Sequence, residues 1–194
     1  MPRVTDPIQL AREWLDQARG AGIPQPEAMA IATADGDGRP SVRIVLMRGL
    51  DDEGFRFYTN RESRKAGEIE ANGHGALVFH WDVLGRQLRA EGPVRRLGDE
   101  ESDAYFAGRP RESQLGAWAS DQSRPLGSRQ ELLERMAGTE RRFAGKPVER
   151  PPHWGGYLLA PEAIEFWEHG EHRLHHRRRF TRTADGWREE LLAP

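Results

Sequence analysis

Five short segments with the composition of β-strands precede the helical stretch of residues 99–145. They cover residues 28–34, 41–47, 55–59, 76–81 and 87–97. The turn sequences Asp35-Gly36-Asp37-Gly38 and Asp51-Asp52-Glu53-Gly54 separate the first three segments, and connections this short join antiparallel neighbours. This order favours a mainly antiparallel sheet over a doubly wound parallel sheet.

Amphipathic segments predict the helices that flank this sheet. The first helix is expected after Asp6 and Pro7, with an apolar stripe formed by Ile8, Ala11, Trp14, Leu15 and Ala18. Further helices are expected from about Ser63 to Asn72, over 100–107 after a cap at Asp99, over 114–119 and after a cap at Ser128. Strands return at 157–159, 163–168 and 174–182 and around Trp187, and Gly92-Pro93 is expected to mark a bulge or an edge. We therefore predict one α+β domain over residues 1–194, built on a closed antiparallel β-barrel with flanking helices.

Composition excludes several classes of function. The 29 Lys and Arg residues nearly balance 31 Asp and Glu residues, which argues against binding nucleic acid through a positive field. The chain has no cysteine, so disulfides, thiolate nucleophiles and Cys-ligated metals are excluded, and redox chemistry needs a borrowed cofactor. No apolar run is long enough for a membrane span or signal segment, so we expect a soluble, cytoplasmic protein.

Four histidines lie close together near the C-terminus: His169, His172, His175 and His176. In a strand, a spacing of three residues puts His172 on the face opposite His169 and His175, so we expect no metal site. The same alternation puts Arg173, His175 and Arg177 on one face of the expected strand. There they could contact an anionic or aromatic ligand, or form the solvated basic edge of a sheet.

Three other groups could bind anions. The first, Tyr105, Arg109, Arg111 and Ser113, lies where a helix ends before Pro110, and it could cradle a phosphate or neutralise the helix end. The second, Ser63-Arg64-Lys65, opens a short helix, where free N–H groups favour an anion; the alternative is surface charge. In the third, Arg43 and Arg48 bracket an apolar run, and their opposite parity predicts different faces and two separate anionic groups.

Taken together, these residues resemble a known family, the pyridoxamine 5′-phosphate oxidases of vitamin B6 metabolism. The resemblance runs through nearly the whole chain beyond the first helix, and its most specific parts are residues 109–118 and 165–177. It is carried by Arg43-Ile44-Val45-Leu46, Phe57-Tyr58-Thr59-Asn60, Ser63-Arg64-Lys65, Arg86-Gln87, Arg109-Pro110-Arg111-Glu112-Ser113-Gln114-Leu115-Gly116-Ala117-Trp118, Gln122-Ser123, Trp154-Gly155-Gly156, Glu165-Phe166-Trp167, Arg173-Leu174-His175 and Leu192-Ala193-Pro194.

The resemblance implies a split β-barrel homodimer that binds two FMN molecules at its subunit interface. The residues that would hold FMN are Arg43, Ile44, Val45, Leu46, Met47, Arg48, Tyr58, Thr59, Arg64, Lys65, Gln87, Gln122, Ser123, Trp167 and Arg177. The residues that would hold the substrate are Arg48, Tyr105, Arg109, Ser113, Arg173, Leu174 and His175, with Arg173 and His175 in catalytic positions. Arg48 stands where the family usually has lysine.

The implied reaction oxidises pyridoxamine or pyridoxine 5′-phosphate to pyridoxal 5′-phosphate, with O₂ as the acceptor and hydrogen peroxide as the second product. Two alternatives remain open at this point. One is a related FMN-dependent oxidase of a secondary pathway, of the phenazine type. The other is a protein that binds FMN or pyridoxal 5′-phosphate without turnover.

Overall fold

The computed structural model describes residues 6–194, and the elements named here are those of this range. The helices are α1 (Pro7–Gly20), α2 (Arg64–Asn72), α3 (Asp99–Ala107), α4 (Arg111–Ala119) and α5 (Arg129–Arg142), with short 3₁₀ turns η1 (Asp82–Leu84) and η2 (Glu171–Arg173). The strands are β1 (Ala28–Ala34), β2 (Pro40–Asp51), β3 (Gly54–Asn60), β4 (His74–Trp81), β5 (Arg86–Arg96), β6 (Trp154–Leu159), β7 (Ala163–Glu168), β8 (His176–Thr183) and β9 (Gly186–Leu191).

The strands form the antiparallel barrel that the sequence predicts. Neighbours follow in the order β4-β1-β2-β3-β6-β5, and pairing of β5 with β4 closes the ring. Strand β2 is long enough to serve two partners, because residues 40–46 pair with β1 and residues 47–51 pair with β3. A register shift between Met47 and Gly49 lies where β2 changes partner. Strands β7, β8 and β9 extend the sheet outward from β5.

The main core fills the barrel and the space under α1. The Asp6 carboxylate caps α1 by accepting from Ile8 N at 2.9 Å, and the predicted apolar stripe is buried. Trp14 packs edge-on against Phe166 of β7, with ring centroids 4.9 Å apart. A smaller core lies among α3, α4 and α5 and includes Phe106, Leu115 and Trp154. Trp154 therefore joins the helical part to the start of β6.

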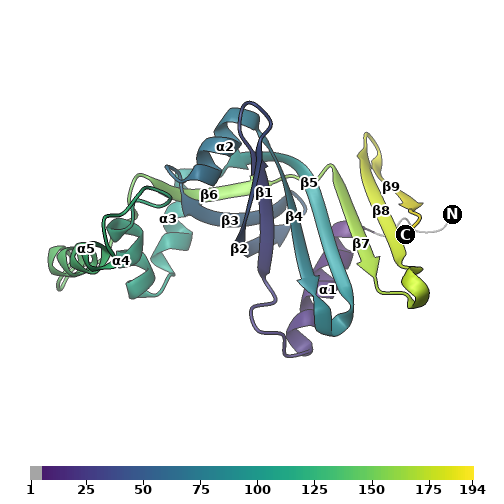
Figure 1. The fold of residues 1–194 in the computed structure, drawn as a ribbon, viewed down its shortest axis with the longest axis horizontal. Helices are drawn as coiled ribbons and strands as arrows, with labels where there is room; N and C mark the ends of the chain where they lie inside the picture. The colour runs from purple at the N-terminus through teal and green to yellow at the C-terminus, as the bar shows by residue number, and fades with distance from the viewer. Residues whose placement is uncertain (1–5) are drawn as a thin grey trace.

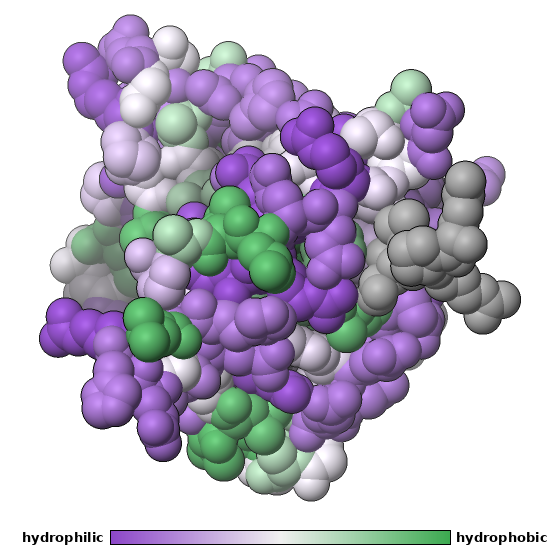
Figure 2. All heavy atoms as spheres, turned by 90° about the vertical axis from the view of Figure 1, so that its right-hand side faces the viewer, coloured by the Kyte–Doolittle hydropathy of each residue, from purple (hydrophilic) through white to green (hydrophobic). Residues whose placement is uncertain are grey.

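Helices α3, α4 and α5 lie together on one side of the barrel, and β8 and β9 lie on the opposite side (Figure 1). The β8–β9 side is mostly hydrophilic, with apolar side chains in small separate groups (Figure 2). Leu174 and Leu191 belong to the exposed large apolar residues of the chain. Between residues 6 and 194, no helix has both the length and the apolar character needed to cross a membrane.

Several predicted boundaries are wrong in detail. At Gly92-Pro93, strand β5 is neither bulged nor at an edge of the sheet. On one side β5 pairs with β4 throughout, and on the other side its partner changes at these two residues from β7 to β6. A side chain at residue 92 would lie 2.2 Å from Ala160 O, which explains the glycine. Gly98, rather than Asp99, is the N-cap of α3, and α4 starts at Arg111.

The expected strand over 174–182 begins only at His176. Gly170 approaches the Leu174 backbone so closely that residues 171–173 form the turn η2, with His172 and Arg173 at positive φ. Arg173 and His175 therefore do not alternate along one strand with Arg177, and the predicted common face does not exist.

Candidate functional site

A cleft of about 630 Å³ opens between β2, β3, the start of α2 and the helical side of the molecule. Most of the residues predicted to bind FMN or the substrate phosphate line it: Arg43, Ile44, Val45, Leu46, Arg48, Tyr58, Thr59, Lys65, Tyr105, Arg109, Ser113, Gln122 and Ser123. Its size is typical of small-molecule sites. Sequence reasoning did not name five further lining residues as site residues: Asn60, Gly116, Ala117, Ser120 and Trp154. All but Ser120 lie in the segments that carry the resemblance, and those segments were the available signal.

Lys65, in the first turn of α2, places a buried ammonium group at one end of the cleft. Its side chain is 7% exposed, and Nζ donates to Thr59 Oγ1 at 3.0 Å and to Gln122 Oε1 at 2.9 Å. Burial, with a further contribution from Arg43, lowers the pKa of Lys65 to about 8. No carboxylate is within ion-pair distance of Nζ among residues 6–194, so the charge is held by neutral acceptors alone.

The buried carboxylate of Glu68 contacts two arginines at this end of the cleft, Arg43 and Arg64. Glu68 Oε2 accepts from Arg43 Nη2 at 3.1 Å, and Glu68 Oε1 accepts from Arg64 Nε at 2.7 Å. Thr33 and Ser41 also donate to this carboxylate. Burial acts to raise the pKa of Glu68, but the hydrogen bonds from Ser41, Thr33 and the arginines prevail and lower it to about 2. Sequence reasoning missed Glu68; its i,i+4 spacing from Arg64 was the available signal.

Arg109 occupies the other end of the cleft, at the break between α3 and α4. Its guanidinium lies over the Trp154 ring, with Cζ 4.5 Å from the ring centroid. Nη1 is fully buried and, among residues 6–194, has no hydrogen-bond partner. Burial lowers the pKa of Arg109, and the nearby charge of Arg48 acts in the same direction. A buried guanidinium N–H without an acceptor is costly, so this end of the cleft suits an anion.

Stacked aromatic rings form the wall beside Arg109. The Tyr58 and Tyr105 rings are parallel, with centroids 3.8 Å apart, and the Trp154 ring lies 5.5 Å from that of Tyr58. Burial, with the neighbouring Glu101 carboxylate, raises the pKa of Tyr58 to about 12. The Tyr58 phenol therefore stays neutral across the physiological range.

Two of the predicted anion groups differ in detail from expectation. Arg43 and Arg48 line one cleft, although the alternation along β2 leaves Arg43 partly buried and Arg48 exposed. Arg111 is outside the cleft lining, and donates to Phe143 O and Lys146 O beyond the end of α5. Pairing with the end of the helix before Pro110 is therefore not seen for Arg111, which instead binds carbonyl groups after α5.

Every residue that lines the cleft lies in a segment that matches a known protein family. Residues 15–140 match the family model described as pyridoxamine 5′-phosphate oxidase, and residues 154–194 match the pyridoxine 5′-phosphate oxidase C-terminal dimerisation region. A pyridoxine/pyridoxamine 5′-phosphate oxidase of Rubrobacter xylanophilus is 56% identical over 97% of this chain and 87% of its own length. The chain belongs to the pyridoxamine 5′-phosphate oxidase family. The resemblance expected from the sequence is thereby confirmed, and with it the prediction of an oxidase of this family.

Other members of the family are similar over the same extent. The enzyme of the same description from Sphingopyxis alaskensis is 53% identical over 97% of this chain and 88% of its own length. The crystal structure of PhzG from Burkholderia lata 383, in complex with tetrahydrophenazine-1-carboxylic acid, has a TM-score of 0.94 and 34% identity. That alignment covers 100% of this chain and 95% of PhzG, so the two proteins share their fold throughout.

The remaining predicted residues do not line the cleft of their own chain. Met47 is buried in the barrel core, and Arg64 is mostly exposed beside Glu68. The others lie on β5, β7, η2 and β8 or on the two residues between η2 and β8: Gln87, Trp167, Arg173, Leu174, His175 and Arg177. Cross-strand pairing brings Gln87 opposite Trp167 and Trp167 opposite Arg177, on the part of the sheet that includes the family's dimerisation region. This second group is continuous but separate from the cleft.

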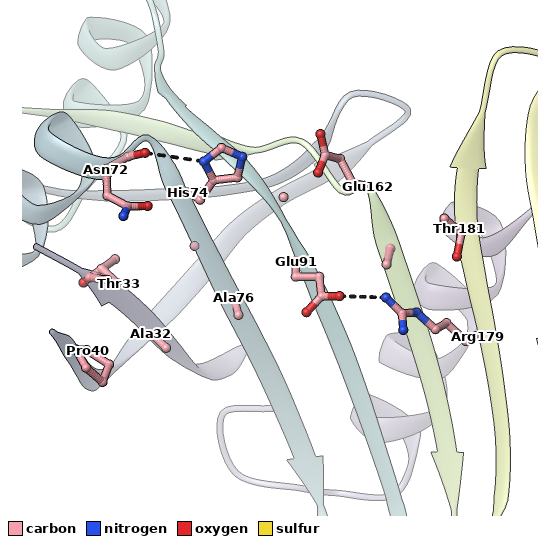
Figure 3. Close-up of a pocket in the computed structure, with 14 residues that line it drawn as sticks. Ala32, Thr33, Pro40, Asn72, His74, Ala76, Glu91, Glu162, Arg179 and Thr181 are labelled. Atoms are coloured by element: carbon pink, nitrogen blue, oxygen red, sulfur yellow. Dashed lines mark hydrogen bonds and ion pairs between the residues drawn. The ribbon is translucent and has the colours of Figure 1, made fainter. Parts of the chain in front are cut away.

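A second hollow of about 540 Å³ lies over β1, β4, β5, β7 and β8 (Figure 3). Ala32 and Ala76 form part of its wall, and Arg179 donates to Glu91 at 3.0 Å (Figure 3). Glu162 adds a second carboxylate. None of the residues predicted to bind FMN or substrate lines it. Among residues 6–194, the arginine of its lining is already paired with a carboxylate, which does not favour a phosphate.

Within residues 6–194, no group of three or more His, Cys, Asp or Glu side chains is placed to hold a metal ion. Two of the four C-terminal histidines, His169 and His175, make ring contacts. The His175 ring lies 4.5 Å from that of Trp167, and the His169 ring lies 5.6 Å from that of His175.

Proposed function

We propose that this chain is an FMN-dependent oxidase that converts pyridoxamine or pyridoxine 5′-phosphate to pyridoxal 5′-phosphate. The observation that carries the proposal is the presence of two pairs of cations in one cleft, Arg43 with Lys65 and Arg48 with Arg109. Two phosphate groups, one from the cofactor and one from the substrate, account for both pairs. The names of the relatives, at 50–56% identity, support the same reaction.

The residues of the first pair suit the FMN phosphate. Lys65 contributes a charge that no carboxylate within residues 6–194 neutralises, and Arg43 is already oriented by Thr33 Oγ1 at 2.6 Å and by Glu68. Fixed donors of this kind bind a dianion without a large loss of side-chain entropy. FMN supplies the two-electron acceptor for oxidation of the substrate C4′ carbon, and O₂ accepts the electrons afterwards.

The residues of the second pair suit the substrate phosphate. Arg109 offers an unpaired buried N–H, while Arg48, Tyr105 and Ser113 line the same end of the cleft. Anchoring the phosphate there fixes the position of the pyridine ring and of its C4′ carbon within the cleft. The stacked rings of Tyr58 and Tyr105 form one side of that end.

We further propose that the active protein is a homodimer in which the second group of residues completes the site. Gln87, Trp167 and Arg177 of the partner subunit would contact the flavin, and Arg173 and His175 of the partner subunit would cover the substrate ring. The match to a dimerisation region over residues 154–194 supports this arrangement, since that region contains all of these residues except Gln87.

The first experiment is an anaerobic one. The FMN-loaded protein is mixed with pyridoxamine 5′-phosphate, and the flavin absorbance is followed. We expect bleaching that reverses in air, with pyridoxal 5′-phosphate as product. A protein that binds FMN but is not bleached by either B6 phosphate refutes the oxidase assignment and favours a carrier.

The Arg109 assignment has its own test. Arg109→Ala should raise the KM for pyridoxamine 5′-phosphate about 100-fold, as expected for lost charge-assisted hydrogen bonds, with FMN affinity unchanged. Arg124→Ala, at an exposed arginine that does not line the cleft, is the matched control. Loss of FMN with an unchanged KM contradicts the assignment.

A second candidate comes from the similarity to PhzG, which was crystallised with a tricyclic carboxylic acid. A carboxylate carries one charge, whereas Arg48 and Arg109 offer two cations at one end of the cleft. Turnover of tetrahydrophenazine-1-carboxylic acid in preference to the B6 phosphates is the result that would favour this candidate.

A further inference from the structure

The segment between β7 and β8 folds into a strained turn that presents Arg173 and His175. Leu174 N donates to Glu171 O at 3.0 Å and closes the turn η2. His172 and Arg173 have φ values of 54° and 65°, in the left-handed region that residues other than glycine rarely adopt. Two consecutive residues in this region require support from surrounding contacts.

Gly170 provides that support through its lack of a side chain. A Cβ atom at this position would lie 2.0 Å from Leu174 O and 2.6 Å from the Leu174 carbonyl carbon. Its backbone φ is −124°, which any residue can adopt, so the requirement for glycine is one of space and not of conformation. The two ends of the turn can approach this closely only if residue 170 is glycine.

The close approach brings the Gly170 N–H to the imidazole of His175. Gly170 N donates to His175 Nδ1 at 3.2 Å. The ring also lies beside the tilted rings of Trp167 and His169, at centroid distances of 4.5 and 5.6 Å. The position and rotation of the ring are therefore fixed from three directions by residues of β7 and of the turn.

This hydrogen bond also determines which ring nitrogen carries the proton. A neutral imidazole has one donor nitrogen and one acceptor nitrogen, and an Nδ1 that accepts from a backbone N–H leaves the proton on Nε2. Within residues 6–194, Nε2 of His175 makes no hydrogen bond. It is the remaining polar atom of the ring and is available as a donor.

We infer that Gly170 is a positioning residue, which holds His175 as the Nε2–H tautomer so that it donates to an acceptor atom of the substrate bound in the partner subunit's cleft. The inference rests on the proposed function for the identity of that substrate. Gly170 has no side chain that could contact the substrate, and the charges of the turn give no indication of this role.

The tautomer is measured first, by ¹⁵N NMR of the FMN-loaded protein labelled at histidine, in mildly alkaline buffer. His175 should show an unprotonated Nδ1 and a protonated Nε2, with the signal assigned by its loss in His175→Gln. A protonated Nδ1 overturns the inference. This measurement needs no turnover, so it stays informative even if the B6 substrates prove wrong.

Two replacements of His175 separate the ring nitrogens chemically. The amide nitrogen of Gln can reach the place of Nε2, and that of Asn the place of Nδ1. We expect His175→Gln to keep at least tenfold more of the wild-type kcat than His175→Asn, with equal FMN affinity in both. Equal activity, or the reverse order, overturns the inference.

Gly170→Ala tests the positioning itself. It should shift the His175 ¹⁵N signals and lower kcat at least tenfold, while the KM changes less than kcat. Gly138→Ala in α5, where the nearest atom to an added Cβ is 3.9 Å away, is the matched control. Unchanged His175 signals in a folded Gly170→Ala protein overturn the inference, and if this variant does not fold, the Gln and Asn pair decides.

Discussion

The depressed pKa of Lys65 makes a quantitative prediction for cofactor binding. An ammonium group with a pKa of about 8 loses its charge progressively as the pH rises above 8. The FMN phosphate is a dianion throughout this range, so it binds the protonated form and takes up a proton when it meets neutral Lys65. FMN affinity should therefore fall as the pH rises.

The size of the effect follows from the protonated fraction. With a pKa of about 8, roughly nine-tenths of Lys65 is charged at pH 7 and roughly one-tenth at pH 9. If only the charged form binds the phosphate, the Kd for FMN rises about tenfold over these two pH units. Binding through Arg43 alone would weaken this dependence, since guanidinium stays charged.

The assay is a titration of flavin fluorescence at several pH values between 7 and 9. Riboflavin, which lacks the phosphate, controls for changes in the rest of the cleft and should bind with a Kd that varies little. Lys65→Arg is the matched variant, because arginine keeps its charge and should flatten the profile. The reasoning is refuted if the Kd for FMN is constant with pH, or if Lys65→Arg retains the same slope.

Two further predictions concern Trp154 and Glu68, which contact the arginines proposed to bind the phosphate groups. Trp154→Leu removes the ring under the Arg109 guanidinium, and should raise the KM for pyridoxamine 5′-phosphate about tenfold while FMN affinity stays the same; an equal loss of both would indicate general damage to the cleft. Glu68 has a pKa of about 2 against an ordinary 4.5, so its stabilising contribution is present above pH 4.5 and is lost as the pH falls toward 2. Glu68→Gln should lower the free energy of unfolding at pH 7 by about 3 kcal/mol and flatten its acid dependence, and a chemical unfolding series from pH 7 to pH 2.5 with an unchanged slope would contradict this.

Local patterns in the sequence were sufficient to predict the barrel and most of its elements. The cap at Asp6, the apolar stripe of α1 and the short turns between β1, β2 and β3 are all determined by neighbouring residues, and the structure has them. The wrong predictions have a different origin. Alternation along a strand failed at Arg173, because a turn at the close approach of Gly170 to Leu174 stands where the strand was expected.

The candidate site could also be predicted in part from local sequence patterns, but not where distant parts of the chain come together. Charged residues could be grouped as candidates for anion binding, but spacing alone left Arg109 and Arg111 equivalent. The fold separates them, since Arg109 enters the cleft and Arg111 binds carbonyl groups beyond the end of α5. Glu68 had no local signal beyond one helical spacing, because Thr33 and Ser41 reach it from distant parts of the sequence.

Some of the predicted site residues line the cleft, and the others lie outside it on the part of the sheet formed by β5, β7 and β8. This division leads to a test of the homodimer. Arg109 lines the cleft, whereas Arg173 lies on the turn η2 outside it. If each active site combines the cleft of one subunit with the turn of the other, Arg109→Ala and Arg173→Ala should each impair both sites of their own dimers, and the activities are compared at a substrate concentration far below the raised KM of Arg109→Ala. A mixed dimer, however, contains one site with both changes and one site with neither.

Unfolding the two variants together and refolding them at equal concentrations should therefore restore activity. Random pairing makes half of the dimers mixed, and each mixed dimer has one intact site of two, so about a quarter of the wild-type activity is expected. Each variant refolded alone is the control for recovery. If every site is built within one chain, the mixture contains no intact site and its activity stays at that of the single variants, which would refute the shared site while leaving the assignment of Arg109 to the cleft untouched.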